Sequence, residues 1–218
     1  MSKYDYVFFD LDGTISNSAE GIVNAAVYAL KKLGIDETDR NRLERLIGPP
    51  LSESFPMYYG LSPEETTKAI KDFRHYYAEK GVLENEMYPD VEKLLIRLSE
   101  GGKTLAVATS KPEKPAREII ERYGIDKHFA YIAGASFDDS RAKKDQVIKY
   151  ALETLNITEP SKVLMVGDRS HDVLGAAKHG IDCIGVLYGY GSRQELSEAG
   201  SLALAETVSQ LGDIILSL

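Results

Sequence analysis

Two aspartates stand one residue apart near the start of the chain. The stretch VFFDLDGTISNS ends an apolar run with Asp10 and Asp12 and then turns at Gly13. Four apolar or aromatic residues followed by a glycine turn predict a short buried strand and its exit. In a parallel sheet both carboxylates would then lie at the carboxyl end of the strand, where ligands bind. Aspartate is also common in turns, so this motif alone does not decide between a site and a turn.

Two further stretches carry groups that can hold a phosphate. LAVATSKP ends a second apolar run with Thr109 and Ser110, whose hydroxyl and backbone N–H groups precede a helix. Such groups at a helix N-terminus bind anions, although they also serve as simple helix caps. RAKKDQVI begins a helix with Lys143 and Lys144. Because cations are slightly unfavourable at the N-terminus of a helix, the local stability of the helix explains these two lysines poorly.

A third apolar run also ends in acidic residues. VLMVGDRSHD reaches Asp168 at the end of the run, and Asp172 follows four residues later. In a doubly wound sheet the strand ends meet at one crevice, so all four carboxylates would gather there. Like charges at close range repel and raise each other's pKa, so the group needs a counter-charge. A hard divalent cation with oxygen ligands, Mg²⁺, meets this need.

The elements that must position these residues alternate along the chain. Short, nearly continuous apolar strands separated by helices predict a parallel sheet that is covered on both faces. We therefore expect an α/β fold with a doubly wound, Rossmann-like core made of residues 1–15 and 83–218. The predicted strands are Tyr6–Phe9, Thr104–Ala108, Phe129–Ala133, Val163–Val166 and Cys183–Leu187. The predicted helices among them are Glu113–Tyr123, Asp145–Asn156 and Asp172–Lys178.

Residues 16–82 break this alternation, because they contain helical patterns and no convincing strand. Ser18 is the expected N-cap of a first helix that ends at Gly34. A second, short helix is expected over Arg42–Ile47, followed by a loop that contains GPP. A third begins with the capping box SPEE at Ser62–Glu65. The segment therefore predicts an all-helical domain inserted into the core.

The composition limits the partners. The chain has 218 residues and a formal net charge of −8, with 34 acidic and 26 basic residues. This balance argues against nucleic acid or an anionic membrane as a partner. Cys183 is the only cysteine, which suits a reducing compartment, and no stretch is long and apolar enough to serve as a signal or a membrane span. We expect a cytoplasmic protein, a monomer, that acts on a small molecule.

Taken together, the motifs resemble those of the haloacid dehalogenase superfamily, and within it the phosphatases similar to phosphoglycolate phosphatase. DLDGT matches the first motif, the strand end at Thr109 the second, the lysine the third and GDRSHD the fourth. Their order and spacing match over essentially the whole chain. The helical insertion resembles the family's cap domain, and GYGSRQEL resembles the C-terminal part of the phosphoglycolate phosphatase branch.

The resemblance implies a Mg²⁺-dependent phosphatase that hydrolyses a small phosphomonoester, such as phosphoglycolate, a nucleoside monophosphate or a sugar phosphate. The reaction would pass through an aspartyl-phosphate on Asp10, with Asp12 as general acid and base. The implied catalytic residues are Asp10, Asp12, Thr109 and Lys144. The implied substrate-binding residues are Thr109, Ser110, Lys144 and Gly13. The implied metal ligands are Asp10, the backbone carbonyl of Asp12, Asp168 and Asp172.

Three alternatives stay open at this point. Lys143 could take the place of Lys144 as the phosphate-binding lysine. A sugar-phosphate mutase of the same superfamily shares all four motifs and would transfer the phosphate instead of releasing it. A catalytically silent binding module would need a broken motif, and none of the four is broken.

Overall fold

The computed structural model describes residues 3–138 and 140–218, and it divides the chain into two compact units. The first consists of the chain up to Ser16 together with Met87–Leu218, and the second is Asn17–Glu86. The chain passes between them at β2 (Ser16–Asn17) and β3 (Glu86–Met87), which pair as a two-stranded sheet. The sequence pattern contained no signal for these two short strands.

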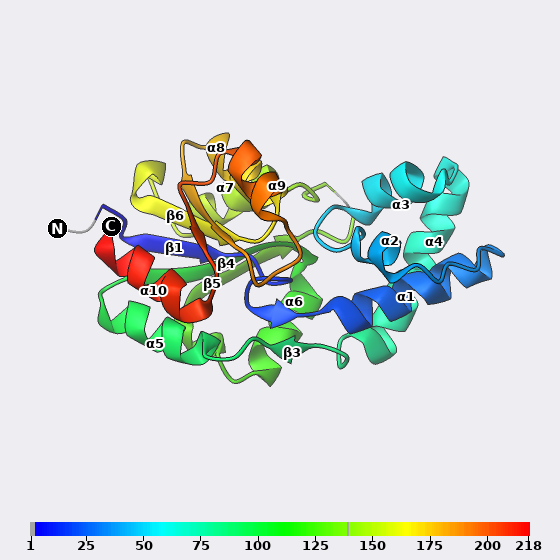
Figure 1. The fold of residues 1–218 in the computed structure, drawn as a ribbon, viewed down its shortest axis with the longest axis horizontal. Coiled ribbons are helices and arrows are strands. Elements are labelled where there is room, and N and C mark those ends of the chain that lie inside the picture. The colour runs from blue at the N-terminus through cyan, green and yellow to red at the C-terminus, as the bar shows by residue number, and fades with distance from the viewer. Residues whose placement is uncertain (1–2, 139) are drawn as a thin grey trace. The chain divides into compact units, whose positions relative to one another are not determined.

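The first unit contains a six-stranded parallel sheet in the order β5-β4-β1-β6-β7-β8. The predicted doubly wound α/β core is therefore confirmed (Figure 1). The five predicted strands are present within a few residues of their expected ends, and β8 is an addition. The strands are β1 (Tyr6–Phe9), β4 (Thr104–Pro112), β5 (Phe129–Ala135), β6 (Val163–Gly167), β7 (Asp182–Val186) and β8 (Ala203–Ala205).

Helices cover both faces of this sheet. In Figure 1, α5 and α10 lie on one face, and α7 and α8 lie on the other. Apolar side chains of α7, including Val147 and Ile148, pack with Phe8 of β1 and Met165 of β6 in a buried cluster. The helices are α5 (Val91–Glu100), α6 (Glu113–Arg122), α7 (Lys144–Thr154), α8 (Ser170–Ala177), α9 (Arg193–Ala199) and α10 (Val208–Ser217), with single 3₁₀ turns at Asp126–His128 and Pro160–Lys162.

The second unit is helical apart from the end of β2 and the start of β3. It contains α1 (Ala19–Lys32), α2 (Arg40–Glu44), α3 (Leu51–Tyr59) and α4 (Pro63–Tyr76), which continues into a π-helical turn over Tyr77–Gly81. The capping box is confirmed, since Ser62 Oγ accepts from Glu65 N and Glu65 accepts from Ser62 N.

The helices of the second unit were predicted only in part. Ser18 occupies the N-cap position of α1 as expected, but its side chain makes no capping hydrogen bond. The second helix begins earlier than expected, because Asp39 caps it by accepting from Asn41 N. No helix was predicted after GPP, but α3 begins there, with Pro50 preceding it.

The strand order explains why the motifs meet. β1 lies in the middle of the sheet between β4 and β6, so the chain leaves β1 toward one side and returns to its other side later. This reversal is the switch point at which the carboxyl ends of strands leave a crevice for a ligand. Three of the four motifs lie at the ends of β1, β4 and β6, the three strands that meet there, and the lysine of the third motif begins α7. In the described parts of the chain, no helix is long and apolar enough to cross a membrane.

Candidate active site

Asp10 follows the last residue of β1 and is buried. Its Oδ1 accepts a hydrogen bond from Leu11 N at 2.7 Å and lies 2.8 Å from Lys144 Nζ. Burial raises the pKa of Asp10 to about 6, and the Asp172 and Asp12 carboxylates raise it as well, while Lys144 opposes the shift. A carboxylate in this position has a fixed orientation, as a nucleophile needs.

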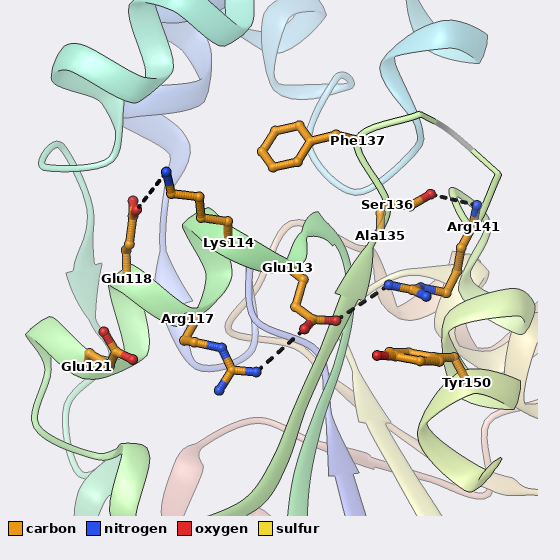
Figure 2. Close-up of a pocket in the computed structure, with 10 residues that line it drawn as sticks. All are labelled: Glu113, Lys114, Arg117, Glu118, Glu121, Ala135, Ser136, Phe137, Arg141 and Tyr150. Carbon is orange, nitrogen blue, oxygen red and sulfur yellow. Dashed lines mark hydrogen bonds and ion pairs between the residues drawn. The ribbon is translucent and has the colours of Figure 1, made fainter. Parts of the chain in front are cut away.

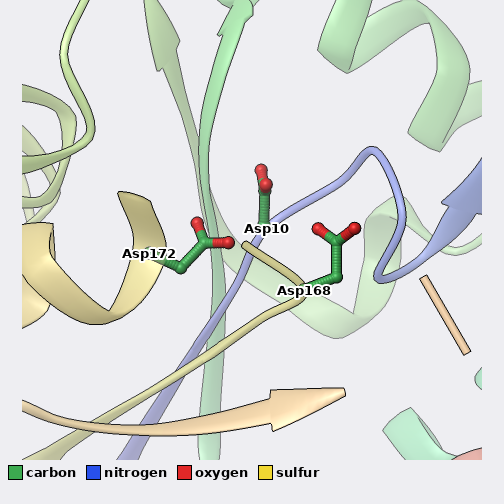
Figure 3. Close-up of side chains that lie close together, drawn as sticks. All are labelled: Asp10, Asp168 and Asp172. Atoms are coloured by element: carbon green, nitrogen blue, oxygen red, sulfur yellow. The ribbon is translucent and has the colours of Figure 1, made fainter. Parts of the chain in front are cut away.

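Asp10, Asp168 and Asp172 form a buried acidic cluster (Figure 3). Each offers one carboxylate oxygen, and the three oxygens lie within 4.8 Å of one another. They come from three different places in the chain: the end of β1, the residue after β6 and the first turn of α8. The expected convergence of the strand ends therefore occurs.

Lys144 is the cation inside this cluster. Its Nζ lies 2.8 Å from Asp10 Oδ1 and 2.8 Å from Asp172 Oδ1, and it donates to Ala108 O at 3.0 Å. Burial by itself lowers the pKa of Lys144, but the two carboxylates outweigh it, and the net shift is upward. Lys143 is exposed. Of the two lysines that the sequence left open, the structure brings Lys144 to the acidic cluster.

The two carboxylate oxygens of Asp168 differ in their hydrogen bonding. Its Oδ2 accepts from Tyr190 N at 2.7 Å, and its buried Oδ1 has no hydrogen-bond partner. Burial, followed by the charges of Asp172 and Asp10, raises the pKa of Asp168 well above its usual value. Gly13, in the left-handed region with φ 80°, lies so close that a Cβ at this position would run into the Asp168 carboxylate.

Gly13 was expected among the substrate-binding residues. Its N–H is donated to Ser16 O at 2.8 Å, within the turn that follows the first motif. Because Gly13 lies so close to Asp168, a side chain at this position would clash, and this steric need for glycine was not evident from the sequence. A direct contact between Gly13 and substrate stays a prediction.

The side chain of Asp12 points to a different cation. Lys111 Nζ donates to Asp12 Oδ1 at 2.9 Å and to Asp12 Oδ2 at 2.7 Å. Both side chains are buried. The TSKP stretch that ends the second apolar run contains this lysine, but nothing local to the stretch indicates which carboxylate the lysine would reach.

Thr109 and Ser110 lie at the end of β4, as expected. Thr109 is buried, and its Oγ1 accepts from Lys111 N at 3.2 Å; Ser110 is partly exposed. Their neighbours on β5 are out of regular register, since the β4–β5 pairing shifts between Ala108 and Pro112. Such bulges re-aim side chains and are frequent next to active sites.

The residues present fit a divalent cation. Three buried carboxylates share one lysine, and the buried Oδ1 of Asp168 has no partner. Burial and the neighbouring carboxylates raise the pKa values of Asp10 and Asp168, and a nearby cation would oppose this shift by favouring the ionised form. All the donors are hard oxygens, which suits Mg²⁺. The Asp12 carboxylate is not in the cluster, and a role for its backbone carbonyl stays a prediction.

Two further side chains, His171 and Cys183, lie outside the acidic cluster. Among the described residues, the histidine of the fourth motif, His171, does not join the group that could hold a metal. Cys183 is buried in β7, where burial raises the pKa of its thiol well above the usual value.

A separate cavity of about 520 Å³ opens beside α6 and the segment between β5 and α7 (Figure 2). It contains none of the acidic cluster. Glu113 at its centre lies 3.5 Å from Arg117 and 3.5 Å from Arg141, and Arg141 stacks on the ring of Tyr150. Its charged groups thus largely satisfy one another.

Comparison with known proteins defines the class. The chain matches the model of the haloacid dehalogenase-like hydrolases over residues 7–186, and it belongs to that family. It is 42% identical to a 5′-nucleotidase of Pseudomonas aeruginosa over 89% of the chain and 87% of the relative. It is 41% identical to the tyrosine-protein kinase PtkA of Mycobacterium tuberculosis over 96% of the chain and 72% of the relative.

Further relatives support the expected branch. A phosphoglycolate phosphatase of Vibrio parahaemolyticus is 30% identical over 96% of the chain and 95% of the relative. A crystal structure of a predicted phosphatase from Clostridium acetobutylicum superposes with a TM-score of 0.96 at 43% identity, covering both chains fully. The chain is a phosphatase of this family, a phosphoric monoester hydrolase.

Proposed function

We propose that the chain is a Mg²⁺-dependent phosphatase that hydrolyses a small phosphomonoester through an aspartyl-phosphate on Asp10. The observation that carries this proposal is the buried acidic cluster of Asp10, Asp168 and Asp172 with Lys144 between two of its members. A cluster of this charge, at the carboxyl ends of parallel strands, suits the binding of a cation and a phosphate together.

In the first step an oxygen of Asp10 forms a bond to phosphorus, and the bond between phosphorus and the leaving oxygen breaks. Asp12 gives a proton to that oxygen, so that an alcohol departs. In the second step water attacks the same phosphorus, Asp12 takes a proton from the water, and the Asp10 carboxylate is released. Acid–base help of this kind contributes about 10²–10⁴-fold to a rate.

Other residues stabilise the charge of the transferring group. Lys144, which already contacts Asp10, would neutralise phosphoryl oxygens, and the Thr109 hydroxyl would donate to one of them. Asp10, Asp168 and Asp172, with the Asp12 carbonyl, would hold Mg²⁺. The bound cation would act as a Lewis acid toward the phosphoryl oxygens.

For the substrate we propose a small phosphorylated metabolite, with nucleoside 5′-monophosphates and phosphoglycolate as the first candidates. The names of the relatives motivate this choice. We further propose that the protein is a cytoplasmic monomer. The net charge of −8 supports a small-molecule partner over a polyanionic one.

A panel of phosphomonoesters tests the proposal. Purified protein with Mg²⁺ should release inorganic phosphate from an aryl phosphate and from at least one metabolite, and exhaustive metal removal should abolish the release. Activity that survives complete metal removal would contradict the metal assignment. Conversion of a sugar phosphate into its positional isomer without phosphate release would favour the mutase.

A second candidate function is transfer of phosphate to tyrosine, which the 41% identity to a tyrosine-protein kinase favours. Incubation with γ-labelled ATP distinguishes the two. A phosphatase releases labelled inorganic phosphate and leaves no acid- and base-stable label on protein, whereas a tyrosine kinase leaves label on phosphotyrosine.

A further inference from the structure

Lys111 and Asp12 form a buried ion pair that none of the four motifs predicts. One ammonium nitrogen donates to both oxygens of one carboxylate, at 2.9 and 2.7 Å. The Lys111 side chain is 6% exposed and that of Asp12 is 10% exposed, so water screens this pair little. A contact with both oxygens restricts the rotation of the carboxylate about its last bond, which a contact with one oxygen would leave free.

The fold places Lys111 by means of an irregularity in the sheet. Between two paired positions β4 advances from Ala108 to Pro112, while β5 advances only from Ala133 to Ala135. The extra residues of β4 form a bulge that contains Lys111, and a bulge changes the direction in which side chains point.

The neighbouring strand is adapted to this bulge. A Cβ at Gly134 of β5 would run into the backbone of Glu113 and Lys111, so only glycine permits the close approach. The Lys111 amide donates to Thr109 Oγ1 at 3.2 Å, which ties the bulge to the second motif. Two separate features of the sheet therefore hold Lys111 where it reaches Asp12.

We propose that Lys111 is the positioning residue of Asp12: its ammonium fixes the carboxylate in the orientation that exchanges protons with the leaving oxygen and with the attacking water. The inference rests on the proposed function, in which Asp12 is the general acid and base. Lys111 keeps its protons throughout. When water attacks, the new bond joins the water oxygen to phosphorus, the Asp10–phosphorus bond breaks, and the water proton moves to Asp12.

The test compares Lys111→Met and Lys111→Arg with Lys103→Met. Lys103 is a matched control, because it is similarly buried, directly precedes the other end of β4 and donates to Tyr4 O at 2.6 Å. For an alkyl phosphate, Lys111→Met should lower kcat about 100-fold, at the low end of the acid–base contribution, while KM stays within about threefold. Lys103→Met should leave both constants unchanged.

An aryl phosphate separates the two chemical steps. Its leaving group needs little protonation, so Lys111→Met should still form the aspartyl-phosphate, which should then accumulate because water activation is impaired. Rapid quench with labelled aryl phosphate measures the bound label. Lys111→Arg keeps the positive charge but places it on a planar guanidinium group. Its kcat should therefore lie between those of Lys111→Met and the wild-type protein.

A double-mutant cycle with Asp12→Asn decides whether Lys111 acts through Asp12. In the Asp12→Asn background, Lys111→Met should change kcat less than about twofold. Equal losses in both backgrounds, or a loss confined to KM, would mean that Lys111 contacts the substrate itself, and would overturn the inference.

Folding and function are monitored separately. Circular dichroism melting shows whether each variant is folded, and if Lys111→Met is not, the cycle is run with Lys111→Arg under the same criteria. Wild-type protein that releases no phosphate contradicts the proposed function. Active wild-type protein with additive variants contradicts only the role of Lys111.

Discussion

Among single residues, the four aspartates of the site differ in the cation that each one meets. Asp10 and Asp172 share Lys144, whereas Asp12 has Lys111. Asp168 accepts one backbone hydrogen bond on Oδ2, and its Oδ1 has no hydrogen-bond partner. Asp168 is therefore the carboxylate that benefits most from a metal ion. Asp12, whose side chain is already held, is suited to proton transfer.

This difference leads to a prediction for the two aspartates of the first motif. Asp10→Asn removes the proposed nucleophile, so no covalent intermediate should form with any substrate. Asp12→Asn keeps Asp10, so an aryl phosphate should still label the protein and the label should accumulate, whereas an alkyl phosphate should hardly react. Rapid quench with labelled substrates measures both. Acid-stable label on Asp10→Asn would show that another residue is the nucleophile.

The two adjacent lysines should respond very differently to the same change. Lys144→Met leaves Asp10 and Asp172 buried without their cation, and breaking a buried pair costs about 3–5 kcal/mol of unfolding free energy. The turnover should also fall about 10²–10³-fold, as for other deleted electrostatic donors. Lys143→Met, on an exposed side chain, is the control and should change neither. Urea denaturation and steady-state kinetics measure the two effects. A larger loss for Lys143→Met would reverse the assignment.

For the elements, the sequence predicts best where one physical signal dominates. The apolar runs of β1, β4 and β6 are buried on both faces, so their pattern is unambiguous. β8 has only three residues, and two of them are only partly buried, so it carries no such signal. α3 contains Pro56, and a proline inside a segment normally argues against a helix there.

The candidate site, like the helices and strands, could be predicted only in part. The position of each aspartate at a strand end follows from the local pattern, and the parallel sheet then brings Asp10 and Asp168 together. The pairing of Lys111 with Asp12 joins residues 99 positions apart in the sequence and depends on a bulge. A bulge is a property of two paired strands, and no single stretch of sequence encodes it.

The turn after β1 gives a prediction about the role of its glycine, Gly13. Gly13 and Gly102 both have positive φ, 80° and 79°, but nothing lies within 4 Å of a Cβ built on Gly102, whereas one on Gly13 meets the Asp168 carboxylate. Gly102→Ala should therefore cost only the backbone strain, about 1–2 kcal/mol. Gly13→Ala should cost more and should also weaken Mg²⁺ binding, because Asp168 must move. Denaturation and calorimetric Mg²⁺ titration compare the two. Equal costs with unchanged Mg²⁺ affinity would show that the turn does not position Asp168.

In the whole molecule, the acidic cluster concentrates part of the formal net charge of −8 at one place. Repulsion among charges of one sign destabilises a compact state. Because the cluster is buried, water and salt screen the repulsion among its carboxylates little. Lys144 offsets only some of this repulsion. A bound divalent cation should therefore affect the stability of the fold as well as its activity.

The last prediction concerns stability against pH. Burial raises the pKa of Asp10 to about 6 and that of Asp168 well above its usual value, so without metal the folded state binds more protons than the unfolded state above about pH 4. The metal-free fold should then lose stability as the pH rises through 6. Bound Mg²⁺ replaces those protons, so it should raise the melting temperature more at pH 8 than at pH 5. The difference between the two increases should be about 5 °C, which corresponds to about 2 kcal/mol of unfolding free energy for a chain of this size. Calorimetry at both pH values with and without Mg²⁺ measures the difference, and Asp168→Asn should remove most of it. An increase that is equal at the two pH values, or that persists in Asp168→Asn, would mean that Mg²⁺ binds elsewhere on the protein.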